Sequence, residues 1–157
     1  MPKGKIVVFM GSKKDYEFAS RINKFLKQEG FGIQCDYLIA SAHKTPQKLL
    51  EEVNKHEGTE EPIVFITVAG LSDALSGVVA GATSHPVVAC PPDLEKFGWA
   101  KFFSSAVTPQ GISVAYVPRP ENAALSAVKM IALSDPALRG RVKVYMQRLK
   151  EIAKAKI

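Results

Sequence analysis

Short apolar runs that alternate with amphipathic segments constrain the fold of this chain more than any other feature. Residues 5–10 and 62–69 are almost wholly apolar and rich in valine and isoleucine, which is typical of strands buried on both faces. Residues 15–29 and 46–56 carry apolar side chains at three- and four-residue spacing, which predicts helices. Because no run of hairpins interrupts this alternation, we expect a three-layer α/β/α sandwich with a mostly parallel, flavodoxin-like or Rossmann-like sheet.

The same patterns predict the remaining elements. Strands are expected over residues 5–10, 33–40, 62–69, 86–89 and 112–117, and helices over residues 15–29, 46–56, 72–82, 121–133 and 135–157. In the second helix Leu49, Leu50 and Val53 are expected to face inward. Residues 91–111 form the least regular stretch, and we interpret them as a long ordered connection of the kind that often serves function.

The size and charge of the chain bound its class. A length of 157 residues predicts one domain over residues 1–157. Residues 1–138 carry 14 basic and 14 acidic side chains, so the net charge of +6 arises wholly in residues 139–157. That segment also has an apolar stripe. Its basic residues fall largely on the other faces of the expected helix, where water can solvate their charges without a binding partner. We therefore expect no nucleic-acid partner. The stripe consists of Leu138, Val142, Tyr145, Leu149 and Ile152.

Nothing in the sequence has the pattern of a membrane or secreted protein. No apolar run is long enough for a membrane span, and the first residues lack the pattern of a signal peptide. The two cysteines, Cys35 and Cys90, cannot build a disulfide framework and have no metal-ligand spacing. We expect a cytoplasmic protein.

The loops that follow the strands contain the candidate site, because ligands of such sheets bind outside the carboxyl ends of the strands. Ser12 precedes a helix, whose first backbone N–H groups and dipole favour a phosphate. Asp15 could accept a hydrogen bond from a ribose hydroxyl or act as a helix-capping carboxylate. Gly70 and Ser72 would let the backbone approach a planar ligand, or would serve close helix–sheet packing.

Residues 41–44, Ser-Ala-His-Lys, form the most informative of these loops. The unperturbed pKa of histidine lies near neutrality, so His43 suits proton transfer. Lys44 can supply a point charge for a phosphate. The alternative interpretation is a polar loop that caps a helix beginning at Pro46. No Cys, His and carboxylate cluster has metal-ligand spacing, and no P-loop pattern is present.

In order and spacing, these motifs resemble the aminoimidazole ribonucleotide (AIR) carboxylase family of purine biosynthesis. Residues after the histidine and in the third and fourth loops resemble its class II members, which use free carbon dioxide and no ATP. The matching blocks are Met10-Gly11-Ser12-x-x-Asp15, Ser41-Ala42-His43-Lys44-Thr45-Pro46, Ala69-Gly70-x-Ser72-x-x-Leu75, Pro86-Val87-x-x-Cys90-Pro91-Pro92, Ser104-Ser105, Pro109-x-Gly111 and Asn122-Ala123-Ala124.

The resemblance implies an activity and a role for each site residue. Class II members reversibly carboxylate AIR to carboxyaminoimidazole ribonucleotide, with no cofactor and no metal. His43 would be the general acid and base. The family also implies a homo-octamer in which the C-terminal helix contacts a neighbour. By the same resemblance, Ser12, Ser41 and Lys44 would hold the phosphate, Asp15 the ribose, and Ala69, Gly70 and Ser72 the imidazole and carboxylate end.

The chain departs from the class II pattern in three of its loops. Leu71 stands where the family usually has arginine and Asp73 where it has asparagine, so a cation is lost and an anion gained near the expected carboxylate end. Lys14 replaces a common serine, and Val107-Thr108 replaces an Arg-Met pair.

Two other functions stay open at this point. One is a mutase that moves the carboxyl group of N-carboxyaminoimidazole ribonucleotide, or a relative that acts on another phosphorylated heterocycle. Mutases usually carry a second histidine where this chain has Ala74. The other is a non-catalytic, nucleotide-binding flavodoxin-like module.

Overall fold

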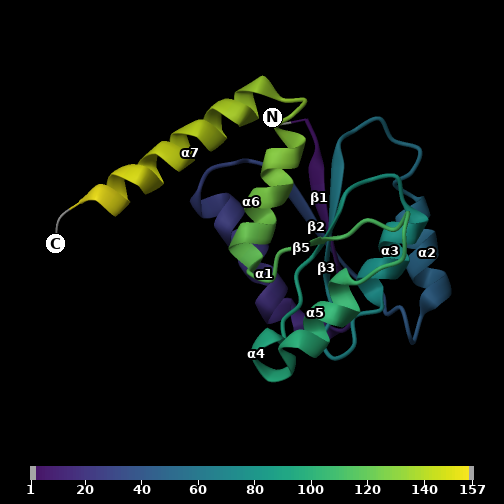
Figure 1. Cartoon of the computed structure of the whole chain (residues 1–157). Helices are drawn as coiled ribbons and strands as arrows, with labels where there is room; N and C mark the ends of the chain where they lie inside the picture. The colour runs from purple at the N-terminus through teal and green to yellow at the C-terminus, as the bar shows by residue number, and fades with distance from the viewer. Residues whose placement is uncertain (1–2, 156–157) are drawn as a thin grey trace.

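A parallel five-stranded sheet in the order β2-β1-β3-β4-β5 organises the computed structural model, which describes residues 3–155 (Figure 1). All four strand pairs are parallel, which confirms the predicted sheet type. The strands are β1 (Lys5–Met10), β2 (Gln34–Ile39), β3 (Ile63–Val68), β4 (Val87–Ala89) and β5 (Ala115–Tyr116).

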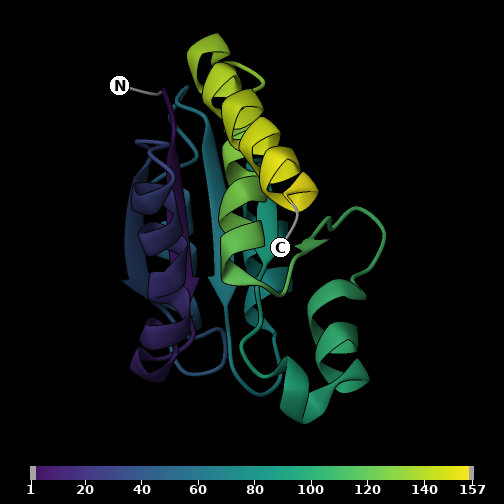
Figure 2. The same ribbon diagram turned by 90° about the vertical axis from the view of Figure 1, so that its left-hand side faces the viewer.

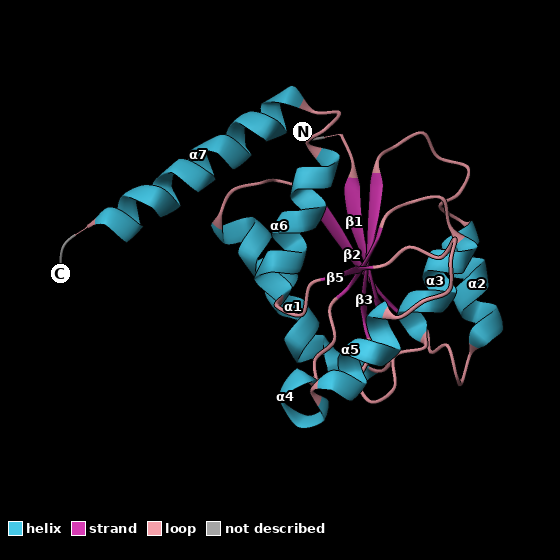
Figure 3. Cartoon of the chain, in the orientation of Figure 1, coloured by secondary structure: helices cyan, strands magenta, loops and turns pink. Residues whose placement is uncertain are grey.

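Helices cover both faces of this sheet (Figure 3). One core packs alternate side chains of β1, such as Ile6 and Val8, against α1 (Tyr16–Gln28) and α6 (Pro120–Ile131). A second core packs the intervening side chains, such as Val7, against α2 (Pro46–Asn54) and α3 (Leu75–Ala82). The predicted three-layer sandwich is confirmed, and two-sided burial explains why β1 and β3 are apolar at consecutive positions.

The carboxyl ends of the strands meet at one edge of the sheet. In register, Met10 of β1 lies beside Ile39 of β2 and Val68 of β3. Backbone hydrogen bonds extend this alignment into the loops, from Gly11 N–H to the Val68 carbonyl and from Ala40 N–H to the Met10 carbonyl, both at 3.0 Å. In Figure 2 the strand arrows point toward the end where α4 (Leu94–Phe97) and α5 (Trp99–Ala106) lie.

Most predicted elements are confirmed with small changes of bounds. The predicted helix over 72–82 begins only at Leu75, because Asp73 accepts a hydrogen bond from Ser76 N–H and forms a turn before the helix. The predicted strand over 112–117 shrinks to Ala115–Tyr116. The inward placement of Leu50 is wrong: its side chain is 47% exposed, because Leu49 and Val53 alone define the buried face of α2.

The stretch over 91–111 is more regular than predicted. It contains α4 and α5, which meet at Gly98, whose positive φ of 49° suits glycine. The ring of Phe102 on α5 packs edge-on against Tyr116 of β5, with ring centroids 5.1 Å apart. The two helices are too short for their apolar spacing to have revealed them in the sequence.

The C-terminal helix α7 (Pro136–Lys154) confirms the predicted amphipathic helix over 135–157, of which residues 156–157 lie outside the described range. Its first half packs on the body through buried Leu138 and Val142. Its second half extends away from the sheet (Figure 1), and Ile152 is 64% exposed. No helix within residues 3–155 is long and apolar enough to cross a membrane.

We predict that Ile66→Ala lowers the free energy of unfolding by about 2–5 kcal/mol, since Ile66 is completely buried in the central strand. Denaturant unfolding followed by circular dichroism measures the change. The exposed Leu133 offers a control, for which Leu133→Ala should cost under about 0.5 kcal/mol. Equal costs for the two variants would contradict the placement of β3 in the core.

Candidate functional site

The first loop is closed by a reciprocal cap. Ser12 Oγ accepts the Lys14 N–H at 3.1 Å, and Asp15 Oδ2 accepts the Ser12 N–H at 3.1 Å. This capping box begins the short 3₁₀ turn η1 (Lys13–Asp15), which continues into α1. Asp15 thus takes part in a cap through one of its oxygens, but Ser12 is the N-cap residue of η1, and Asp15 makes no side-chain capping bond to α1.

The first and third loops lie against each other at Gly70. A Cβ atom at Gly70 would lie 3.4 Å from Asp15 Oδ1 and 3.0 Å from Asp93 Oδ2. A Cβ at Gly11 would lie 3.6 Å from the Cβ of Ala69. A side chain at position 70 would therefore have to displace one or both of these carboxylates. The structure brings together Ser12, Asp15, Ala69 and Gly70, as the sequence predicts.

Asp15 is an ionisable group in a partly buried position. Desolvation raises its pKa above the ordinary value, the hydrogen bond from Ser12 N–H opposes this, and the nearby Asp93 raises the pKa further. Ionised Asp15 is therefore held at a cost in the free protein. A ligand hydroxyl that donates to this carboxylate would offset part of that cost.

The second loop presents His43 and Lys44 at its tip. Ser41 Oγ accepts the Lys44 N–H at 3.1 Å, and Thr45 Oγ1 accepts the Ser41 N–H at 3.0 Å. These bonds close the loop on itself while the side chains of His43 and Lys44 are exposed. Pro46 occupies the first turn of α2, as predicted. Because β2 adjoins β1, this loop lies at the same edge as the first loop.

The third loop separates exposed from buried side chains. Leu71 is 68% exposed and Ser72 is also exposed, whereas Asp73 is 2% exposed. Asp73 accepts the Ser76 N–H at 3.0 Å and the Ser76 hydroxyl at 2.5 Å. The expected extra anion at the carboxylate end is therefore a buried carboxylate at the start of α3. Ser76 Oγ lies 2.6 Å from Thr67 Oγ1, which completes the network.

Two residues whose side chains bind the third loop, Lys101 and Asp93, are absent from the sequence-based prediction. Lys101 of α5 donates from Nζ to the carbonyl oxygens of Ala69, at 2.5 Å, and of Leu71. Asp93 Oδ2 accepts the Leu71 N–H at 2.7 Å. The sequence did contain one signal for Lys101: it is the single charged residue in residues 97–106, within the long connection over 91–111.

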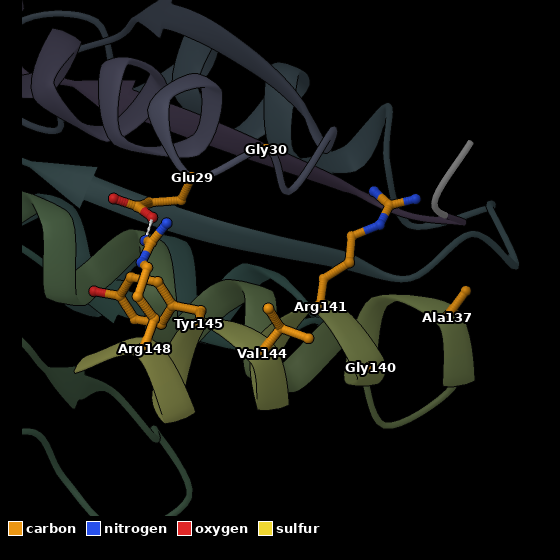
Figure 4. Close-up of a pocket in the computed structure, with 8 residues that line it drawn as sticks. All are labelled: Glu29, Gly30, Ala137, Gly140, Arg141, Val144, Tyr145 and Arg148. Atoms are coloured by element: carbon orange, nitrogen blue, oxygen red, sulfur yellow. Dashed lines mark hydrogen bonds and ion pairs between the residues drawn. The ribbon is translucent and has the colours of Figure 1, made fainter. Parts of the chain in front are cut away.

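Two cavities lie away from this edge. One, of about 410 Å³, separates the end of α1 from α7 (Figure 4). Its arginines are already engaged, because Arg148 pairs with Glu29 and Arg141 donates to the Phe31 carbonyl at 2.7 Å. The other, of about 650 Å³, includes Gly4 and Gln34 at the amino ends of β1 and β2. We assign both to packing, since the chemically equipped loops lie elsewhere.

The structure is that of an α/β protein whose polar loops gather at the carboxyl edge of a parallel sheet, the edge at which ligands of such folds bind. A family model described as AIR carboxylase matches residues 5–152, and the chain belongs to the AIR carboxylase family. The family inferred from the loop motifs is thereby confirmed. The chain is an enzyme of this family, so a non-catalytic module is not favoured.

Relatives and solved structures agree with this membership. The chain is 45% identical over 152 residues to a phosphoribosylaminoimidazole carboxylase of Archaeoglobus fulgidus, covering 96% of this chain and 82% of the relative. It is 38% identical to an N5-carboxyaminoimidazole ribonucleotide mutase of Methanocaldococcus jannaschii, covering 93% and 90%. The crystal structure of Treponema denticola PurE superposes with a TM-score of 0.90 at 37% identity, covering 96% and 94%.

We predict that Asp15→Asn raises the melting temperature of the free protein at pH 7. The folded-state pKa of Asp15 is raised, so its contribution to stability is full below the unfolded pKa and is lost as pH rises through the folded pKa. Asparagine avoids that loss and can still accept the Ser12 N–H. The difference should narrow below about pH 4, as thermal scans across pH would show. An equal difference at all pH values would contradict the prediction.

Proposed function

We propose that this protein catalyses the ATP-independent, reversible carboxylation of AIR by carbon dioxide in purine biosynthesis. The observation that carries the proposal is the meeting of the loops containing Ser12, His43 and Gly70 at the carboxyl edge of the sheet. The carboxylase and the mutase named above support it, because this chain is similar to both over most of its length.

Each loop contributes a different part of substrate binding. Ser12 and the exposed start of η1 offer a hydroxyl and N–H groups to a phosphate, and Ser41 and Lys44 add a hydroxyl and a cation. Asp15 binds the ribose hydroxyls. The imidazole and the new carboxylate lie against Ala69, Gly70 and Ser72, where the lack of a side chain at Gly70 permits close approach.

His43 carries the proton step. The ring carbon of AIR attacks carbon dioxide, forming a carbon–carbon bond, and the adduct still bears the ring-carbon proton. His43 removes that proton, which restores the aromatic ring, and returns it in the reverse decarboxylation. Since no electrons leave or enter the substrates, the reaction needs no redox partner. The binding loops hold carbon dioxide against the nucleophile.

The mutase is the second candidate, because one relative carries that name. Ala74, half-buried at the start of α3, supplies no second imidazole, and this favours the carboxylase. The carboxylase and mutase activities are distinguished by incubating the purified protein with carboxyaminoimidazole ribonucleotide, without ATP. Ultraviolet absorbance follows the loss of this compound. Decarboxylation to AIR supports the carboxylase; conversion only between the two carboxylated isomers identifies a mutase.

We predict that His43→Asn lowers kcat for decarboxylation by about 10²- to 10⁴-fold, because the variant lacks the base, while AIR binding is retained. Calorimetric titration with AIR measures the binding. His85→Asn is the matched control, since the His85 ring contacts the His56 carbonyl, away from this edge, at 3.0 Å. Near-normal turnover in His43→Asn would exclude the proposed role.

We also propose that α7 joins this chain to other copies in a homo-oligomer, an octamer by family resemblance. Val144, Leu149 and Ile152 expose apolar side chains on α7, and Leu149 and Ile152 lie beyond Arg148, which pairs with Glu29 of the body. Three arginines of the helix make intramolecular contacts, which supports an assembly role over a nucleic-acid partner; they are Arg139, Arg141 and Arg148.

The two cysteines support a cytoplasmic location, which we propose as the site of action. Both Cys35 and Cys90 are free thiols. Burial raises the pKa of Cys35 to about 11, so this group stays protonated at neutral pH. Free cysteines are typical of proteins in a reducing compartment.

We predict that Ile152→Glu lowers the molar mass measured by size-exclusion chromatography with light scattering, because it places a charge in the proposed contact. Lys150→Glu alters charge on the same helix and serves as the control. An unchanged mass in Ile152→Glu would contradict assembly through this face.

A further inference from the structure

Lys101 is a buried cation that the proposed reaction does not use. Its side chain is 1% exposed, and it comes from α5, outside the three loops proposed to bind substrate. Among residues 3–155 no other lysine or arginine is buried. Burying an ammonium group is costly unless partners are present, so its position calls for an explanation.

The contacts of Lys101 converge on the third loop. Nζ donates to the carbonyl oxygens of Ala69 and Leu71, the two residues that flank Gly70. One turn along α5, Ser104 Oγ accepts the Asp73 N–H at 3.2 Å. One face of α5 therefore holds the backbone of the third loop at three points.

Leu71 has a backbone conformation that needs such support. Its φ of 59° lies in the left-handed region, which is unfavourable for a branched side chain. Its N–H donates to the Asp93 carboxylate at 2.7 Å and its carbonyl accepts from the Lys101 ammonium. Both peptide groups of Leu71 are thus held by charge-assisted hydrogen bonds of opposite sign.

The surrounding charges keep this arrangement balanced. Burial lowers the pKa of the Lys101 ammonium, and neighbouring carboxylates oppose that lowering. Buried Asp73, at a position where the family usually has asparagine, is the first of these neighbours. The positive charge of Lys101 and the negative charge of Asp73 therefore favour each other. The three carboxylates are Asp73, Asp93 and Asp15.

We propose that Lys101 and Asp93 form a clamp that fixes Leu71 in the left-handed conformation and so positions the third loop for the carboxylate end of the substrate. The identity of the substrate rests on the proposed function, whereas the clamp itself rests on the hydrogen bonds described above. Lys101 is a positioning residue in this scheme, because its buried ammonium acts through the backbone of Ala69 and Leu71.

Lys101→Met tests the clamp with two independent readouts. Hydrogen–deuterium exchange over residues 69–76 should become faster in the free protein, and kcat/KM should fall by about 100-fold. Most of the loss should appear in kcat, because the first and second loops still bind the phosphate. Lys96→Met, which removes an exposed lysine of α4, is the control. Exchange and kinetics equal to those of the control would overturn the proposal.

Leu71→Gly separates the clamp from a general role in stability. Glycine adopts positive φ without penalty, so the clamp has less to hold. Lys101→Met should therefore cost clearly less kcat/KM in the Leu71→Gly background than alone. An equal cost in both backgrounds would overturn the proposed link to Leu71.

A charge-balanced variant keeps the test decisive if Lys101→Met does not fold. Asp73→Asn removes the buried anion that accompanies Lys101, and the asparagine amide oxygen can still accept the Ser76 N–H. The double variant Asp73→Asn/Lys101→Met should therefore fold. It should still show faster hydrogen–deuterium exchange over residues 69–76. Unchanged exchange would overturn the clamp. If the unmodified protein fails to turn over AIR, the proposed function fails while the exchange result still decides the clamp.

Discussion

The parallel pairing of β1 with both β2 and β3 is the constraint on which the rest of the structure depends. It sets Met10 level with Ile39 and Val68, so the chain leaves three neighbouring strands at one height. The loops that follow must then share a single edge. Two-sided burial of β1 and β3 fixes this register, because a slip of one residue would exchange the side chains that face the two helical layers.

The sequence alone was sufficient for the architecture, because periodicity reports directly on which faces are buried. The apolar runs of β1 and β3 and the stripe of α1 lie where predicted. Prediction was weaker where local structure depends on distant contacts. Leu50 looked like a core residue by spacing alone, and α4 and α5 are stabilised by Gly98 and by packing of Phe102 on Tyr116 rather than by a long apolar pattern.

The candidate site shows the same division. Ser12, Asp15, Ala69 and Gly70 were predicted and lie together, because each directly follows a strand whose end the fold positions. Lys101 and Asp93 were missed, since their importance comes from contacts across 22 to 32 positions of the chain. The position of Asp73 was predicted near the site, but its burial was not, because a sequence does not show which way a carboxylate points.

Burial of Asp73 alongside Lys101 also bears on how such loops can be exchanged between related enzymes. A chimera that received only the segment 69–73 from a relative with asparagine at position 73 would keep the buried ammonium of Lys101 and lose the negative charge of Asp73, which favours the charged form of that ammonium. The segment around Lys101 would have to be transferred with it. Residues 69–73 and 93–104 therefore have to be exchanged together, although nearly twenty residues separate them in sequence.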